Sequence, residues 1–366
     1  MFRIVFSLTV LLVLAAASGA DRLSNALIGE ALSQPVSLQF DGTLSEALDR
    51  IARETGVSVK LSNDAYSILP AGQLTPVRGR FENVPLADVL ELIASRLALR
   101  VQRADGFVEL SALPVAVRCG QPLSWKELKV IELLRVTPLA LQQSHPSYVE
   151  LTGAIDQRLL ELSREFPAEG AGANKLVLED RSRDVVPADR VIALPKSVSL
   201  YDALEMLSEQ SSVTWYPWDG DIVLVPKRDL HQRLLLKRVN LNYTGDDVER
   251  LLDQLEQSSG VPFRYEPGVV QRVRPDRRVV NVSATRTTIR SVLEAIQRST
   301  GLVWTVDDDG VLIGYRERIA ALLPLENGLL VPLYEGQLPE PLRERIDSAT
   351  RSWLERHGAP TTRPAP

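Results

Sequence analysis

The chain has 366 residues, with 42 lysines and arginines, 47 aspartates and glutamates, and one cysteine. The small acidic excess gives no general attraction to nucleic acid or to anionic membranes, and a lone cysteine excludes an intrachain disulfide. The length predicts two or three domains, each with a modest core.

The first 20 residues have the pattern of a secretory signal peptide. Arg3 precedes an apolar run from Ile4 to Ala17, and small residues follow from Ser18 to Ala20. The apolar run is shorter than the roughly 20 residues of a membrane-spanning helix, although a retained anchor is the alternative. We therefore expect a soluble, exported mature chain in a bacterial periplasm, with outer-membrane association as an extension of that expectation.

Residues 35–113 predict a first small α+β module. Two helices are expected in it, because apolar residues recur at the i, i+3, i+4, i+7 spacing of one helical face. They are Leu44, Ala47, Leu48 and Ile51 in one helix, and Leu86, Val89, Leu90 and Ile93 in the other. Strands are expected at 36–40, 57–61, 77–84, 99–101 and 107–110. The prediction is a short β-sheet with two helices packed on one face.

Residues 235–316 repeat that module element for element, which predicts tandem copies. A helix carrying Leu251 and Leu255 ends at Ser259 and Gly260, as the first helix ends at Thr55 and Gly56. The other expected elements are strands at 239–243, 261–265, 278–282, 302–306 and 311–315, and a helix with Ile289, Val292, Leu293 and Ile296.

Residues 114–228 are predicted to be a divergent second copy with an extra helix. Capping boxes are expected at Ser124 with Glu127, before a helix to about Val136, and at Ser147 with Glu150, before a helix to about Phe166. Strands at 176–178, 190–194, 213–216 and 222–225 and a helix capped by Ser199 complete the expected copy. The alternative is a helical linker with half a module.

Residues 317–366 lie outside the repetition. We expect a short helical segment at 318–323 and an extended segment at 329–334 that could add to a sheet edge. An amphipathic helix is expected from Pro341, either packed on its own domain or bound to a partner, and a disordered end from Ala359 to Pro366.

The first module resembles the secretin/TonB short N-terminal (STN) domain family. The resemblance rests on Val36–Phe40, Leu44–Leu48, Thr55–Val57, Gly79–Leu86, Asp88–Leu90 and Asp105–Gly106. It covers the third module nearly as well, the second more weakly, and nothing after Tyr315. It implies small periplasmic modules that act as docking and signalling surfaces. The chain after Tyr315 is too short for secretin or receptor strands, so the resemblance implies only an adaptor or interaction role.

No residue set points to catalysis, to a metal site or to a cofactor. The histidines, His145, His231 and His357, lie far apart, whereas a zinc site needs several converging ligands. There is no Gly-x-Ser-x-Gly motif and no glycine-rich phosphate loop with its lysine. Cys119, near Val115 and Val117, is expected to be a buried small hydrophobe rather than a reactive thiol. The chain is thus not expected to be an enzyme.

Three aromatic residues precede the Asp219–Gly220 turn of the second module. Trp215, Tyr216 and Trp218 could form a platform for a ligand or a peptide. The alternative is that alternate members pack beneath the helix and only one is exposed.

A basic run joins the two halves of the third module. Its members are Arg272, Arg274, Arg277 and Arg278. They predict either a docking patch for an acidic partner or anionic surface, or a solvated loop.

Small sheets leave free edges, and a free edge accepts a strand from a partner by main-chain hydrogen bonding. The leading prediction is therefore a periplasmic scaffold that docks an envelope protein of a secretion or transport system, or its own copies. The alternative is a soluble cell-envelope ligand-binding or glycan-binding protein that uses the hairpin near Trp215. An exported hydrolase is the least favoured reading.

Overall fold

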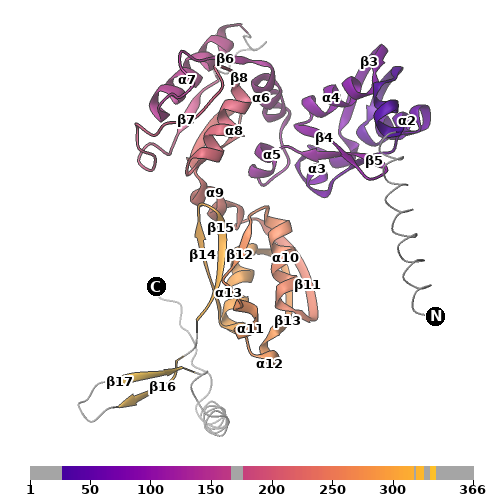
Figure 1. The fold of residues 1–366 in the computed structure, drawn as a ribbon. Helices are drawn as coiled ribbons and strands as arrows, with labels where there is room; N and C mark the ends of the chain where they lie inside the picture. Colours follow the sequence, from indigo (N-terminus) through magenta and orange to yellow (C-terminus); the bar gives the residue numbers. More distant parts are fainter. Residues whose placement is uncertain (1–26, 166–175, 317–318, 325–329, 335–366) are drawn as a thin grey trace, which may run out of the picture. The chain divides into compact units, whose positions relative to one another are not determined.

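The computed structural model describes residues 27–165, 176–316, 319–324 and 330–334 (Figure 1). Its architecture is mixed α+β, with small sheets of two or three strands and helices repeated in modules, which confirms the predicted fold class. The predicted signal peptide and the helix expected from Pro341 lie outside the described residues. In the described part, no helix is both long and apolar enough to cross a membrane. Residues up to Lys237 form one compact unit, and nearly all later residues form a second.

The first module contains two sheets rather than the single sheet that the sequence predicts. Its elements are β1 (Pro35–Thr43), α2 (Leu44–Thr55), β2 (Val59–Leu61), α3 (Asn63–Ile68), η1 (Gly72–Leu74), β3 (Pro76–Pro85), α4 (Leu86–Arg96), β4 (Leu99–Ala104) and β5 (Phe107–Ala112). Strand β1 pairs antiparallel with β3, while β5 lies between a parallel β2 and an antiparallel β4. Helix α2 contacts β1 and β2, and α4 contacts β3 and β4, so the helices join the two sheets.

The helices form where an apolar stripe at helical spacing lies between suitable capping residues. Thr43 and Glu46 make a capping box at the start of α2, and Gly56, at φ 72°, ends the helix in the left-handed conformation. All four predicted stripe residues of α2 are buried, as are those of α4. Helix α3 was not predicted, because six residues are too few to show a helical period.

The second module repeats the strand and helix order of the first. Its elements are α5 (Pro114–Arg118), α6 (Trp125–Val136), β6 (Pro138–Ala140), α7 (Tyr148–Glu165), β7 (Leu178–Asp180), β8 (Ser197–Ser199), α8 (Leu200–Gln210), β9 (Val213–Trp218), β10 (Asp221–Pro226) and α9 (Lys227–Leu234). The predicted capping boxes begin α6 and α7, and Ser199 caps α8. Helix α6 is the extra helix, and it precedes the first strand of the copy.

The strand predicted at 190–194 is not regular. This segment makes one bridge, between Ser147 and Val191, and further main-chain bonds to residues 144–148. Pro146 accepts from the Ile192 N–H at 3.0 Å but has no N–H to donate, so a continuous ladder cannot form. The regular strand is β8, and the strand predicted at 176–178 lies at β7, two residues later.

The third module belongs to the second compact unit and follows the first closely. Its elements are β11 (Arg238–Asp247), α10 (Val248–Ser259), β12 (Phe263–Tyr265), α11 (Val269–Arg272), α12 (Pro275–Arg278), β13 (Val279–Thr288), α13 (Ile289–Thr300), β14 (Leu302–Asp307) and β15 (Gly310–Tyr315). Beyond it, β16 (Ile319–Pro324) and β17 (Leu330–Tyr334) form an antiparallel pair. The helical segment expected at 318–323 was wrong, because a short apolar run suits either structure and pairing with β17 makes it a strand.

The repetition extends to individual main-chain bonds. In each module the short strand runs parallel to the second strand of the hairpin, as β2 with β5, β7 with β10 and β12 with β15. The same bond precedes each pairing: Val108 N–H to Ser58 O at 2.9 Å, Ile222 N–H to Val177 O at 3.0 Å and Val311 N–H to Pro262 O at 2.8 Å. One backbone plan therefore underlies three divergent sequences.

A β-bulge also recurs. Next to the bulge in β1 and β3, Asn83 has φ 55° and donates its N–H to Ser37 Oγ at 3.2 Å. Next to the bulge in β11 and β13, Arg286 has φ 51° and donates to Asn240 Oδ1 at 2.8 Å. The first and third modules thus share a left-handed residue supported by a polar side chain.

We predict that Gly310→Ala destabilises the chain by more than about 2 kcal/mol, because a Cβ at φ 124° would collide with the Pro262 carbonyl beside β12. Gly153→Ala is the matched control. Gly153 lies inside α7 with no atom within 4 Å of a new Cβ, so alanine should stabilise by about 0.5–1 kcal/mol. Urea unfolding of both variants measures the two effects, and equal stabilities would contradict the expectation.

Candidate functional site

The three predicted aromatic residues do not form one surface. Trp215 is fully buried and meets Tyr201 edge to face, with ring centroids 5.8 Å apart. Tyr216 is also buried, whereas 44% of Trp218 is exposed. Trp215 and Trp218 thus point to opposite faces of β9, and of the three rings only Trp218 is exposed. This is the second of the two arrangements considered from the sequence.

Helix α9 packs against the other two aromatic rings of β9, those of Tyr216 and Trp218. The Arg233 guanidinium lies 3.9 Å from the centroid of the Tyr216 ring and 5.9 Å from that of Trp218. Its Nη2 also donates to the Arg118 carbonyl at 2.8 Å. Such stacking of a cation on aromatic rings fixes the packing of α9 against the hairpin.

The arginines of the basic run in the third module interact largely with residues of their own loop. Arg274 pairs with Asp276 at 3.2 Å, and Arg278 donates to the main-chain oxygens of Val273 and Gln271. Arg277 also has an interaction partner. Arg272 is the most exposed of the four arginines, and its guanidinium lies 3.9 Å from the Glu266 carboxylate. These arginines therefore mainly stabilise the conformation of their own loop, and Arg272 is the one most accessible to solvent.

Among the described residues, no group of three or more histidine, cysteine or carboxylate side chains could hold a metal ion. His145 lies beside Ser144 Oγ at 3.0 Å, His231 is on α9, and His357 is outside the described part.

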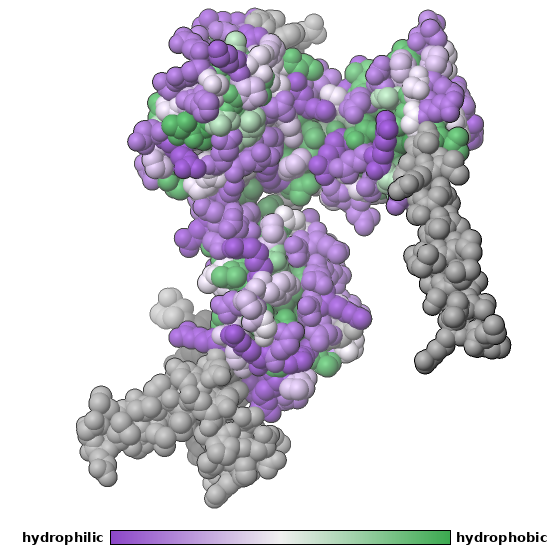
Figure 2. Space-filling model, viewed as in Figure 1, coloured by the Kyte–Doolittle hydropathy of each residue, from purple (hydrophilic) through white to green (hydrophobic). Residues whose placement is uncertain are grey.

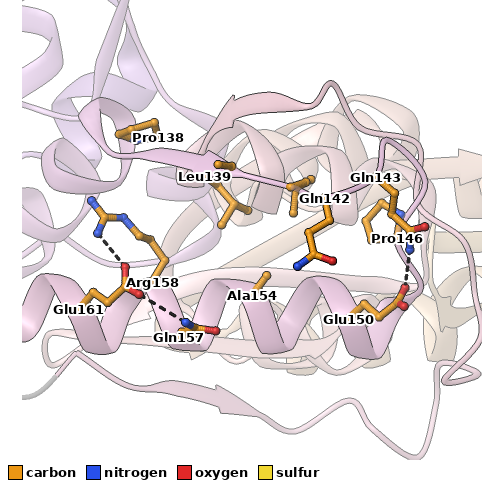
Figure 3. A pocket seen from close by; sticks show the side chains of 12 residues that line it. Pro138, Leu139, Gln142, Gln143, Pro146, Glu150, Ala154, Gln157, Arg158 and Glu161 are labelled. Carbon is orange, nitrogen blue, oxygen red and sulfur yellow. Dashed lines mark hydrogen bonds and ion pairs between the residues drawn. The ribbon is translucent and has the colours of Figure 1, made fainter.

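Grooves flank the two-stranded sheets of the first and second modules. One lies between α7 and the segment from Pro138 to Pro146, and it encloses about 1000 Å³ (Figure 3). About half of its lining is polar, with Gln143 bonded to Glu150 at 3.0 Å and Arg158 paired with Glu161 at 2.9 Å. These groups satisfy one another, so this groove offers few free charges.

A smaller groove in the first compact unit is more apolar. It encloses about 460 Å³ between β3 and α4, and we call it the β3–α4 groove. It is lined by Pro76, Val77, Arg78, Phe81, Leu92, Ile93, Arg96, Leu97 and Trp125. Leu92 is 40% exposed and Trp125, from the extra helix α6, is 52% exposed. Figure 2 shows patches of hydrophobic residues on the visible face of the first module.

Strand β3 presents a free main-chain edge to this groove. Arg78 O accepts from Arg96 Nη1 of α4 at 3.4 Å, so Arg78 faces away from β1. Gln39 O on β1 accepts from Arg50 at 2.7 Å, so the Gln39 and Arg80 pair also faces outward. Because outward and inward pairs alternate in antiparallel sheets, both observations agree. The N–H and C=O groups of Arg78 and Arg80 thus point toward the α4 side.

In the second module, a side chain meets the main chain of one residue in the segment before β8. The Gln210 amide, at the end of α8, accepts from the Ala193 N–H at 2.8 Å and donates to the Ala193 oxygen at 2.9 Å. Gln210 occupies the position in α8 that Arg96 occupies in α4, counted from Leu200 and Leu86.

Sequence reasoning missed the β3–α4 groove, although two signals were present. Leu92 is a large apolar residue one position off the predicted buried stripe of α4, and Trp125 directly follows the cap Ser124. An apolar residue off the stripe is expected at the surface. That both lie on one groove follows only from the packing of α6 on α4.

Comparison of the chain with protein families, curated proteins and solved structures finds no match.

We predict that truncating the two tryptophans of β9 lowers the free energy of unfolding by very different amounts. Trp215→Ala should destabilise the chain by about 3–5 kcal/mol because it leaves a large buried cavity. Trp218→Ala should cost about 1 kcal/mol or less, since the side chain is largely at the surface. Urea unfolding followed by tryptophan fluorescence measures both, and a larger loss for Trp218 would contradict the assignment.

Cys119 provides a chemical test of the same region. Burial, reinforced by the Glu127 carboxylate, raises the pKa of its thiol to about 12. We therefore expect slow reaction of the native chain with an aromatic disulfide at about pH 8, and fast reaction in urea, where the pKa is ordinary. Because the folded pKa is the higher one, stability should fall as pH rises from about 9 toward 12. Rapid labelling of the native thiol would contradict its burial.

Proposed function

We propose that this chain is an exported periplasmic interaction or scaffold protein, built of modules that resemble the secretin/TonB short N-terminal domain. In this proposal it docks a protein of an envelope secretion or transport system through free sheet edges. The observation that carries the proposal is the open edge of β3, where the outward main-chain groups of Arg78 and Arg80 lie along the strand and Arg78 lines an apolar groove. The signal-peptide pattern of the first 20 residues supports the compartment.

Tandem modules suit a scaffold. Each described module has small sheets of two or three strands, each of which ends in two edge strands, and linked sites raise the overall affinity through effective concentration. Divergence of the sequences also allows each copy a different surface. In the second module, the groove beside α8 carries Asp202, Glu205 and Glu209, whereas the β3–α4 groove carries two arginines.

A glycan-binding function would need exposed rings that lie side by side. Trp215 has no exposed surface, and Trp218 stands perpendicular to Tyr216, with an interplanar angle of 89°. The geometry therefore favours protein docking over the aromatic hairpin as the functional surface.

The test is a capture experiment with the mature chain and an envelope extract of a bacterium that produces it. Three matched variants, Val108→Pro, Ile222→Pro and Val311→Pro, each remove the equivalent N–H from the central strand of one module. We expect a specific protein partner that is lost with at least one variant and kept by the others. Circular dichroism checks that each lesion is local.

Capture of glycan fragments alone, or a partner retained by all three variants, would count against a docking function carried by these modules.

A further inference from the structure

We infer that the β3–α4 groove binds an extended segment of a partner protein, rich in apolar and acidic side chains, as an added strand on β3. The inference rests on the proposed docking function and names its site and the chemistry of its ligand. Three features of the groove carry it: its open main-chain groups, its exposed apolar wall and its arginines.

The main-chain groups match an incoming strand. Arg78 and Arg80 are two residues apart, and each directs one N–H and one C=O away from β1. That spacing is the repeat with which a strand exchanges hydrogen bonds with its neighbour. A peptide laid along this edge is the mode of recognition in which the main chain supplies affinity and side-chain pockets supply selectivity.

The second module shows how one side chain can satisfy both an outward N–H and an outward C=O group. There Gln210 both accepts from and donates to Ala193, as a neighbouring strand would. Arg96 cannot replace it, because a guanidinium has donors and no acceptor. On the main chain of β3, Arg96 therefore bonds the carbonyl of Arg78, at 3.4 Å, and it cannot accept from the outward N–H groups.

The wall of the groove selects apolar side chains. Leu92 and Trp125 expose 40% and 52% of their surfaces beside the edge. Gly79 lets the Phe81 ring lie across the strand, since a Cβ at position 79 would come within 2.7 Å of that ring. An apolar side chain that alternates inward from an added strand would remove these surfaces from water.

The charges select an acidic segment. The side chains of Arg78 and Arg96 are 83% and 51% exposed. Their carboxylate neighbours are Asp41, 71% exposed, and Glu132, 3.9 Å from Arg96. Exposed ion pairs are weak, so both arginines can exchange these partners for the carboxylates of a peptide. Movement of Arg96 from Arg78 O would at the same time free that oxygen for the added strand.

The experiment uses the purified mature chain and a fluorescein-labelled peptide, acetyl-Glu-Val-Leu-Val-Glu-amide, with binding followed by fluorescence anisotropy. Arg80→Pro removes an outward N–H without touching the ladder to β1, and Arg80→Ala is its control. We expect the proline variant to bind at least about fivefold more weakly, the effect of one main-chain hydrogen bond. The alanine variant should bind within about twofold of the original chain, since the Arg80 side chain pairs with Glu82 outside the groove.

A charge exchange tests selectivity. Arg96→Glu should weaken binding of the glutamate peptide and strengthen binding of acetyl-Lys-Val-Leu-Val-Lys-amide, which a general loss of folding cannot do. Trp125→Ala should weaken both peptides, because it removes apolar surface common to the two complexes. Hydrogen exchange should show protection of residues 76–82 when the peptide is bound.

No binding by the original chain at about 1 mM peptide would overturn the inference. Equal binding by the proline and alanine variants, or protection confined to another strand, would overturn it as well. Its failure is separable from that of the proposed function. An envelope partner captured equally by Arg80→Pro would leave the scaffold proposal standing without this groove, whereas peptide binding without any captured partner would remove the scaffold proposal alone.

Discussion

The described structure depends on how very small sheets satisfy their outer edges. A sheet of two or three strands has nearly as many edge groups as paired ones, and each unpaired group is costly unless water or a side chain meets it. The first unit shows two internal solutions. Arg50 donates to the oxygen of Gln39 on β1, and Gln210 meets both main-chain groups of Ala193. The outward groups of Arg78 and Arg80 on β3 have no comparable amide beside them in the lining of the β3–α4 groove.

The inserted helix α6 gives the first module features that the repeated plan does not contain. Its first residue, Trp125, contributes to the wall of the β3–α4 groove, and Arg135, near its end, donates to the oxygen of Leu99 at the start of β4 at 3.4 Å. Within the second module, Arg118 of α5 makes a bidentate pair with Glu205 of α8 at 2.7 and 2.8 Å. The inserted helix thus contributes both a contact with β4 and part of the lining of the β3–α4 groove.

Much of the fold could be predicted because its signals are local. The stripe that begins at Leu44 and the caps at Ser124 and Ser199 depend on residues within one or two turns of helix, and the structure has those helices. The strand order of each copy could be predicted by repetition. The candidate binding residues were less predictable. Aromatic residues close in sequence, such as Trp215 and Trp218, alternate between the interior and the surface along a strand, so closeness in sequence did not place them on one surface.

By itself the sequence determined the mixed α+β class, the helices with their caps and the tandem repetition, because periodicity and capping are properties of neighbouring residues. The tertiary structure alone decided that each module divides its strands between two sheets, that residues 190–194 lack a regular ladder, and that 319–324 is a strand. It alone brought Leu92, Trp125 and the edge of β3 together. The physical reason is that strand pairing and groove formation join residues distant in the chain, and the local pattern that predicts a strand does not specify its partner.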